Sequence, residues 1–127
     1  MKEEINSALI VARRPEVRDG LRALLMATPG VDNVIQAANA HEALLIARAQ
    51  CPTMVLLDIN SMHDGAQELI EEITAVCSRC GFIVLIDHAG QRQEAESAGA
   101  DTVLQKGCPS WKLVAAVSSL LGTPVIT

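Results

Sequence analysis

Short apolar runs alternate along the chain with segments whose apolar residues recur at helical spacing. Five runs are typical of buried strands, at residues 8–11, 34–37, 54–57, 82–86 and 102–104. Helical spacing predicts five helices. The first begins at about Pro15, the next three cover residues 40–49, 69–77 and 91–98, and the last begins near Pro109. Continuous apolar strands that alternate with helices predict an α/β fold with a five-stranded parallel sheet covered on both faces. Right-handed crossovers make that sheet doubly wound.

Three of these helices have a recognisable inward face. The first is expected to bury Val17, Leu21, Leu24 and Leu25, the third Leu69, Ile70, Ile73, Val76 and Cys77, and the last Leu113, Val117, Leu120 and Leu121. The fourth helix is short and polar, and Gly99 is expected to end it.

Length and composition favour one globular domain. The 127 residues, 50% hydrophobic and 20% charged, suffice for a single core over residues 1–122, with 123–127 as a tail or the start of a linker. No apolar run approaches the roughly 20 residues that span a bilayer, and the N-terminus carries acids, so we expect a cytoplasmic protein without membrane contact. The net charge of −5 argues against direct nucleic-acid binding by this domain.

Four cysteines are present, at positions 51, 77, 80 and 108. In a cytosolic chain we expect reduced thiols. Cys77 and Cys80 form a C-x-x-C pair, which is typical of a redox pair or half of a zinc site, although two unlinked thiols are the favoured interpretation. A metal or thiol sensor that uses Cys77, Cys80 and His88 stays open as an alternative.

Asp58 is the most informative residue, because the apolar strand at 54–57 ends directly in this carboxylate. The last side chain of such a strand lies at the carboxyl edge of the sheet, where open α/β folds place ligands and chemistry. A lone aspartate there is a phosphate acceptor, a metal ligand or a structural cap.

These features resemble the receiver domain of bacterial two-component response regulators over nearly the whole chain, most closely receivers that precede a helix-turn-helix output domain. The resemblance rests on segments 8–11, 18–25 and 55–60, on Asp64-Gly65, on 99–101 and on Lys106. It implies the strand order 2-1-3-4-5 of the flavodoxin-like class.

The resemblance also implies a set of functional positions. In this family an acidic pair after strand one and the acceptor Asp hold Mg²⁺, together with a backbone carbonyl that Asn60 can still offer. Asp58 matches the acceptor and Lys106 the phosphoryl-binding Lys. The acidic pair is replaced by Ala12 and Arg13, and the Thr or Ser that ends strand four by Ile86. Val103 stands in place of the aromatic residue in strand five.

Charge arithmetic then disfavours the metal. Three carboxylates and one Lys sum to about −2 in the family, whereas Asp58, Lys106 and Arg13 sum to +1. We therefore expect lost or weak Mg²⁺ binding, and Arg13 or Lys106 paired with Asp58. Asp87 restores one acid only if its side chain turns inward, the less expected orientation. The predicted function is an atypical receiver, not an enzyme, that acts by protein contact; a working phospho-acceptor at Asp58 is the alternative.

The last helix carries little charge on its outer positions. These are taken to include Trp111, Ala115, Ser118 and Ser119. A low-charge face beginning with a tryptophan suits an interface better than a solvated surface. Following the family, we expect a homodimer or a protein partner to bind through the fourth helix, the fifth strand and the fifth helix. A DNA-binding output domain, fused or separate, is a further expected partner.

Overall fold

The structure is a computed structural model that describes residues 5–61 and 65–122. Five parallel strands form one sheet in the order β2-β1-β3-β4-β5, so the predicted fold class and strand order are confirmed. The register pairs each strand directly with its neighbours; Asp58, for example, lies opposite Leu85. The strands are β1 (Ser7–Val11), β2 (Asn33–Ala37), β3 (Met54–Asp58), β4 (Gly81–Ile86) and β5 (Thr102–Gln105).

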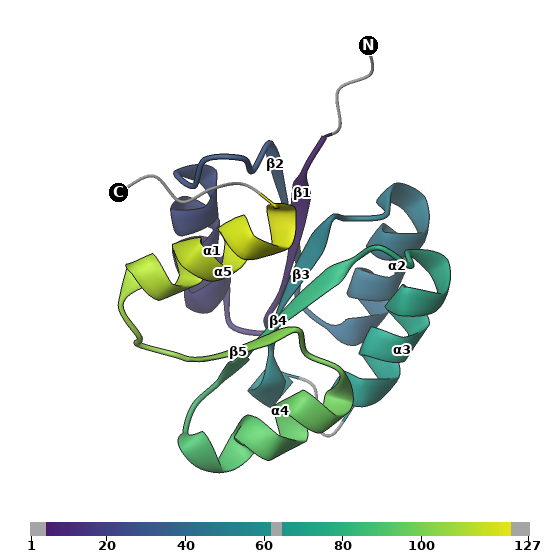
Figure 1. Ribbon diagram of the computed structural model, residues 1–127. Helices are drawn as coiled ribbons and strands as arrows, with labels where there is room; N and C mark the ends of the chain where they lie inside the picture. The colour runs from purple at the N-terminus through teal and green to yellow at the C-terminus, as the bar shows by residue number, and fades with distance from the viewer. Residues whose placement is uncertain (1–4, 62–64, 123–127) are drawn as a thin grey trace.

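Helices cover both faces of this sheet (Figure 1). Helices α1 and α5 pack on one face, and α2, α3 and α4 on the other. Their bounds, with two short 3-10 helices, are α1 (Pro15–Met26), α2 (Ala40–Gln50), η1 (Ile59–Ser61), α3 (Ala66–Val76), η2 (Ala89–Gln91), α4 (Arg92–Ala98) and α5 (Ser110–Leu121). No helix in the described part of the chain is long and apolar enough to cross a bilayer.

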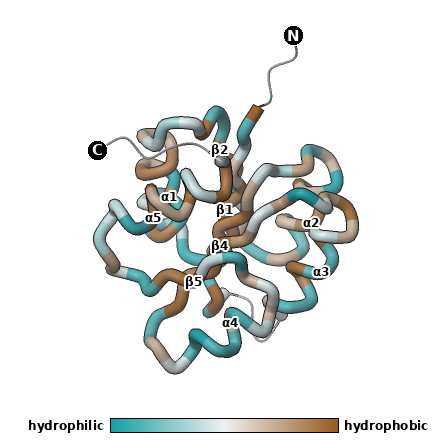
Figure 2. The backbone as a smooth tube through the Cα atoms, in the orientation of Figure 1, coloured by the Kyte–Doolittle hydropathy of each residue, from teal (hydrophilic) through white to brown (hydrophobic). Residues whose placement is uncertain are grey.

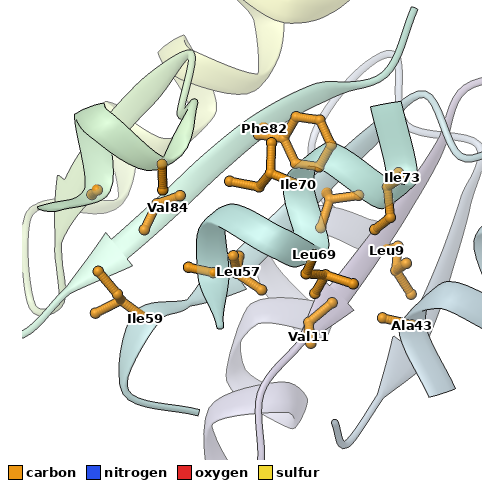
Figure 3. Packing of buried hydrophobic residues seen from close by; sticks show 14 of the residues in the cluster. Leu9, Val11, Ala43, Leu57, Ile59, Leu69, Ile70, Ile73, Phe82 and Val84 are labelled. Atoms are coloured by element: carbon orange, nitrogen blue, oxygen red, sulfur yellow. The ribbon is translucent and has the colours of Figure 1, made fainter. Parts of the chain in front are cut away.

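The core has two layers, one on each side of the sheet. Side chains alternate along β3, so that Val55 and Leu57 face α2 and α3, while Met54 and Leu56 face α1 and α5. Figure 3 shows the first layer, in which Leu69, Ile70 and Ile73 of α3 pack over the strands. The apolar strands are the brown centre of Figure 2, and polar residues lie mostly outside. This buried sheet fixes the strand ends from which the candidate site is built.

Most predicted helix features are present, with two errors in burial. Gly99 does end α4, with a left-handed φ of 112° that favours glycine. Val76 was expected to face inward, but its side chain is 43% exposed because α3 ends there and the chain turns away. Ser118 was placed on the outer face of α5, yet it is only 4% exposed.

The expectation of four reduced thiols is wrong for two of them. Cys51 and Cys77 form a disulfide with a Cα–Cα distance of 5.4 Å, whereas Cys80 and Cys108 are free. The C-x-x-C interpretation fails because Cys77 bonds to a residue 26 positions earlier instead of to Cys80. The predicted tail at 123–127 and the motif residue Asp64 lie outside the described residues.

Candidate functional site

Three neighbouring strands bring ionisable side chains to the carboxyl edge of the sheet. Asp58 is the last residue of β3, Asp87 follows β4, and Lys106 follows β5. The backbone N–H of Lys106 donates to the carbonyl of Ile86 at 2.7 Å, which continues the pairing of β5 with β4 by one residue. The parallel register therefore aims all three side chains at one place.

Lys106 joins the two carboxylates. Its ammonium Nζ lies 2.7 Å from Oδ1 of Asp58 and 2.9 Å from Oδ1 of Asp87. Asp58 is 3% exposed, against 28% for the Lys106 side chain and 44% for that of Asp87. The expected contact between Lys106 and Asp58 is present, and Asp87 takes the inward orientation that seemed less favoured. Short charge-assisted hydrogen bonds of this kind are stronger than neutral ones.

A network of amides surrounds the ion pairs. The backbone N–H of Asn60 donates to Asp58 Oδ1 at 3.1 Å, and its side-chain amide donates to Asp87 Oδ2. Gln91 donates to Asn60 Oδ1 at 2.8 Å and accepts from the backbone N–H of Asp87 at 2.7 Å. Gln105 donates to the carbonyl oxygen of Asp87 at 3.3 Å. These bonds hold the β4–α4 loop against the β3–α3 loop.

Three of the positions at which the family resemblance implies a polar or aromatic group carry an apolar residue here. Ala12 and Ile86 are fully buried, and Val103 is 8% exposed. A methyl group at position 12 offers no metal ligand, and an isoleucine at 86 offers no hydroxyl. All three side chains belong to the hydrophobic core, so the polar chemistry at this edge comes from Asp58 and from the loops that follow β4 and β5.

Arg13 belongs to the loop after β1 at the same edge. Its backbone N–H donates to Oγ of Ser61 at 2.8 Å, which ties this loop to the residues after Asp58. Arg18 holds the loop from the other side, because its guanidinium Nη1 donates to the carbonyls of Ala12 and Arg13 at 2.8 and 3.0 Å.

Sequence reasoning missed Arg18, Gln91 and Gln105. Gln91 lies four residues after Asp87, and Gln105 is the last residue of β5, so strand-end position was the signal available for both. Arg18 was read only as part of a family motif.

The residues of the predicted metal sensor do not lie together. Cys77 is bonded to Cys51, and Cys80 and His88 flank β4 at opposite ends. That strand places them on the order of 20 Å apart. Among residues 5–61 and 65–122 no group of three metal-ligating side chains is found.

The ion pairs shift two pKa values. The hydrogen bond from Lys106 is the main reason that the pKa of Asp87 lies below its ordinary value. Burial lowers the pKa of Lys106, but the hydrogen bonds to Asp58 and Asp87 outweigh it, so that pKa is raised overall. Both shifts favour the charged forms that pair with each other.

We predict a pH dependence that reports this cluster. Because the pKa of Asp87 is depressed, its stabilising contribution is present above the unfolded value of 3.8 and is lost as the pH falls through the folded value. The pKa of Lys106 is raised, so its stabilising contribution is present below the unfolded pKa of 10.5 and is lost as the pH rises through the folded pKa. Urea unfolding across this range should therefore show a plateau with a fall at each end.

In the variant Asp87→Asn, the unfolding free energy should fall less at acid pH than in the wild type. The difference should be less than about 1 kcal/mol, because the side chain of Asp87 is well exposed to solvent. Asp19→Asn, at an exposed position of α1, removes the same charge elsewhere and serves as the control. Identical acid limbs in the wild type and Asp87→Asn would contradict a role for this pair.

Comparison with known proteins agrees with this geometry. The family model described as the response regulator receiver domain matches residues 8–118. The chain belongs to the response regulator receiver domain family. A curated relative, the nitrate/nitrite response regulator protein NarL of Escherichia coli K12, is 25% identical over 107 residues. That match covers 82% of this chain and 49% of NarL, so this receiver spans about half the length of the curated relatives it matches.

Solved structures give the same result. A two-component response regulator of the LuxR family from Aurantimonas sp. SI85-9A1 superposes with a TM-score of 0.81 at 26% identity, covering 97% of this receiver and 90% of that chain. The response regulator TrrA from Thermotoga maritima, in complex with Mg²⁺ and BeF, has a TM-score of 0.79 at 25% identity, covering 91% and 99%. A CheY-like receiver from Methanospirillum hungatei, at 22% identity, shares the fold with a TM-score of 0.80.

Proposed function

We propose that this receiver transmits a signal by protein contact and does not depend on Mg²⁺-assisted phosphorylation of Asp58. The observation that carries the proposal is the start of the loop after β1, where the buried methyl group of Ala12 and the cation Arg13 stand in place of the acidic pair that the family resemblance implies. Of the carboxylates that remain at this edge, Asp58 and Asp87, both bond to the ammonium of Lys106. The proposal therefore rests on missing metal ligands, with Lys106 as the counter-ion of the buried Asp58.

The oxygen donors at the edge do not fit a magnesium ion. Mg²⁺ prefers near-octahedral oxygen ligands and is usually held by one or two carboxylates with water. The first acidic position is the methyl group of Ala12, and the second is the cation Arg13. Both remaining carboxylates face Lys106 within 2.9 Å, so an entering dication meets an ammonium at short range.

The positions that report phosphorylation in the family also lack their chemistry. Ile86 has no hydroxyl to follow a phosphoryl oxygen, and Val103 has no ring to rotate. Both are packed in the core. A chemical change at Asp58 therefore cannot be passed to the surface around β5 through a hydroxyl or an aromatic ring. Contacts at that surface are instead governed by the partner and by protein concentration.

One observation favours a second candidate, a working phospho-acceptor. Asp87 supplies a carboxylate beside Asp58, so Asp58, Asp87, Lys106 and Arg13 sum to −1 −1 +1 +1, or zero, instead of +1. A site with zero net charge repels a cation less than a site with a charge of +1. It still attracts a cation less than the family site, whose charge is about −2. Gain of a phosphoryl group at Asp58 separates the two candidates.

We propose the α4–β5–α5 face as the contact surface. β5 is an edge strand, and Trp111 at the start of α5 is 65% exposed, with the ammonium of Lys112 5.8 Å from the centre of its ring. Large exposed aromatic residues are enriched in protein interfaces. A symmetric dimer is the default assembly for such a patch. Ser118 is removed from this surface, because it is buried.

Assembly should respond to charge on this face. We predict that Ala115→Glu combined with Ser119→Glu abolishes self-association or partner capture while leaving the fold intact, because Ser119 is exposed and Ala115 only half-buried. Sedimentation and a pull-down measure this.

Gln67→Glu with Thr74→Glu, at exposed positions of α3, adds the same charge elsewhere and should leave assembly unchanged. A receiver that stays monomeric at high concentration, captures no partner and ignores the first pair of substitutions would remove the role of this face.

The relatives suggest what lies beyond the receiver. NarL is about twice the length of the matched region, and the Aurantimonas regulator is named as a LuxR-family protein. A DNA-binding response regulator of the LuxR family from Staphylococcus aureus has the same receiver fold. We infer that this module regulates a DNA-binding output domain, fused or separate, within a cytoplasmic pathway.

A further inference from the structure

A disulfide joins the ends of two neighbouring helices, far from the Asp58 site. Cys51 caps the C-terminus of α2 and Cys77 that of α3 (Figure 1). Both residues precede the strands that follow them, β3 and β4, so the bond lies at the amino edge of the sheet. Asp58 lies at the carboxyl edge. The disulfide is therefore separate from the site already described.

The two cysteine residues differ in exposure. Cys51 is exposed, whereas Cys77 is only 6% exposed. A surface hollow of about 630 Å³ lies beside the bond and is lined by both cysteines, Pro52, Thr53, Val76 and Cys80. An incoming thiolate can therefore reach the sulfur of Cys51 from solvent and leave Cys77 as the departing group.

The surroundings suit both oxidation states. The sulfur of Cys51 lies 3.2 Å from the carbonyl oxygen of Val76, and that of Cys77 lies 3.3 Å from the carbonyl oxygen of Ala47. A disulfide sulfur has no proton to donate, but a thiol at the same place has one. After reduction the two sulfurs must move apart, and each S–H group has a carbonyl acceptor close by, so the buried Cys77 need not become an unsatisfied donor.

The backbone at Cys51 indicates that the bond holds an unusual conformation. Its φ of 42° makes it the one non-glycine residue with a positive φ in the part of the chain that the structure describes. An L-residue adopts this region at a cost, and such conformations persist where the surroundings impose them. The bond to Cys77 and the hydrogen bond from the Cys51 N–H to Ala47 supply that constraint.

A third thiol nearby does not compete. Cys80 lines the same hollow, but burial, together with the nearby charge of Asp101, raises its pKa to about 12. It therefore stays a protonated thiol and a weak nucleophile near neutral pH. Exchange is confined to the pair that the fold brings together.

We propose that Cys51 and Cys77 form a reversible thiol–disulfide exchange site, reduced by a dithiol and re-formed by a disulfide oxidant such as glutathione disulfide. In reduction, one thiolate of the dithiol attacks Sγ of Cys51, the Sγ–Sγ bond breaks, and Cys77 leaves with the electron pair and takes a proton. The second thiol of the reductant then attacks its own mixed disulfide and releases Cys51. Two electrons and two protons pass from the dithiol to the protein, and the dithiol becomes a disulfide.

The test uses the whole chain in its native state. The protein is equilibrated with mixtures of glutathione and glutathione disulfide or with dithiothreitol, then denatured in N-ethylmaleimide and mapped by mass spectrometry. We expect two of the four cysteines to be protected under oxidising conditions, recovered as one peptide that links Cys51 to Cys77. Dithiothreitol without denaturant should make all four reactive.

Three variants sharpen the result. Cys80→Ser should behave as the wild type, and Cys51→Ser should leave Cys77 alkylated. Closing a loop of 26 residues should also raise the melting temperature of the oxidised form by about 10 °C, a difference that Cys51→Ser combined with Cys77→Ser abolishes.

Four reactive cysteines under glutathione disulfide would overturn the proposal, as would a Cys77–Cys80 link, equal melting temperatures in both states, or a bond that native dithiothreitol cannot reduce. None of these outcomes bears on Asp58.

Discussion

Replacing Lys106 with methionine is expected to destabilise this receiver by about 2 kcal/mol. The substitution keeps most of the side-chain volume but leaves the carboxylate of Asp58, 3% exposed, without its cation. Removal of one partner from a fully buried pair typically costs about 3–5 kcal/mol, and the 28% exposure of Lys106 admits water that reduces this. Urea unfolding near neutral pH measures the change.

A second substitution separates the charge from the packing. Asp58→Asn combined with Lys106→Met should recover stability to within about 1 kcal/mol of the wild type, because no buried charge is left uncompensated and the amide oxygen still accepts from Asn60. Asp87 also loses its cation, but its carboxylate is 44% exposed and stays hydrated. Lys112→Met, at an exposed position of α5, should change stability by less than about 0.5 kcal/mol. If Lys106→Met were as stable as the wild type, the ion pair between Lys106 and Asp58 would not stabilise the fold.

The variant Ser118→Glu is expected to lose about 3 kcal/mol or more of unfolding free energy, because it places a carboxylate at a position that is 4% exposed. Ser119→Glu, one residue later and exposed, should change the same quantity by less than about 0.5 kcal/mol. Both variants are compared by urea unfolding. Equal losses would mean that the two serines are not on different sides of α5.

The architecture could be predicted because its signals are local. Apolar runs such as residues 54–57 are stable only when buried, because their exposure to water is unfavourable. A chain that alternates such strands with helices has few topologies that bury them. The burial of Ser118 could not be predicted in this way. Its hydroxyl argues for an outer position, but Ala116 and Ser118 flank Leu113 and Val117 on a buried stripe wider than the apolar residues alone mark.

The site was predictable in part, for a topological reason. Asp58 and Lys106 end or follow apolar strands, and parallel strands present those ends together. Asn60 and Lys106 hold the carboxylate of Asp87, while Gln91 and Gln105 bond to its backbone. The three amide residues lie in loops or at a strand end and have no sequence pattern of their own. Only the folded loops bring these amides into contact.

The disulfide was missed because the sequence places its cysteines 26 residues apart in two different helix ends. Spacing drew attention to Cys77 and Cys80 instead. Helices α2 and α3 lie side by side on the sheet, and that packing, which no local signal reports, pairs Cys51 with Cys77.

The most direct measurement of the proposed mode of action is the intact mass of the protein after incubation with acetyl phosphate and Mg²⁺, recorded at once at neutral pH. Since Ala12 and Arg13 stand where the family resemblance implies the acidic pair that holds the metal, the mass should not change. A gain of one phosphoryl group that requires Mg²⁺ and disappears in Asp58→Ala would contradict signalling without phosphorylation and establish Asp58 as an acceptor.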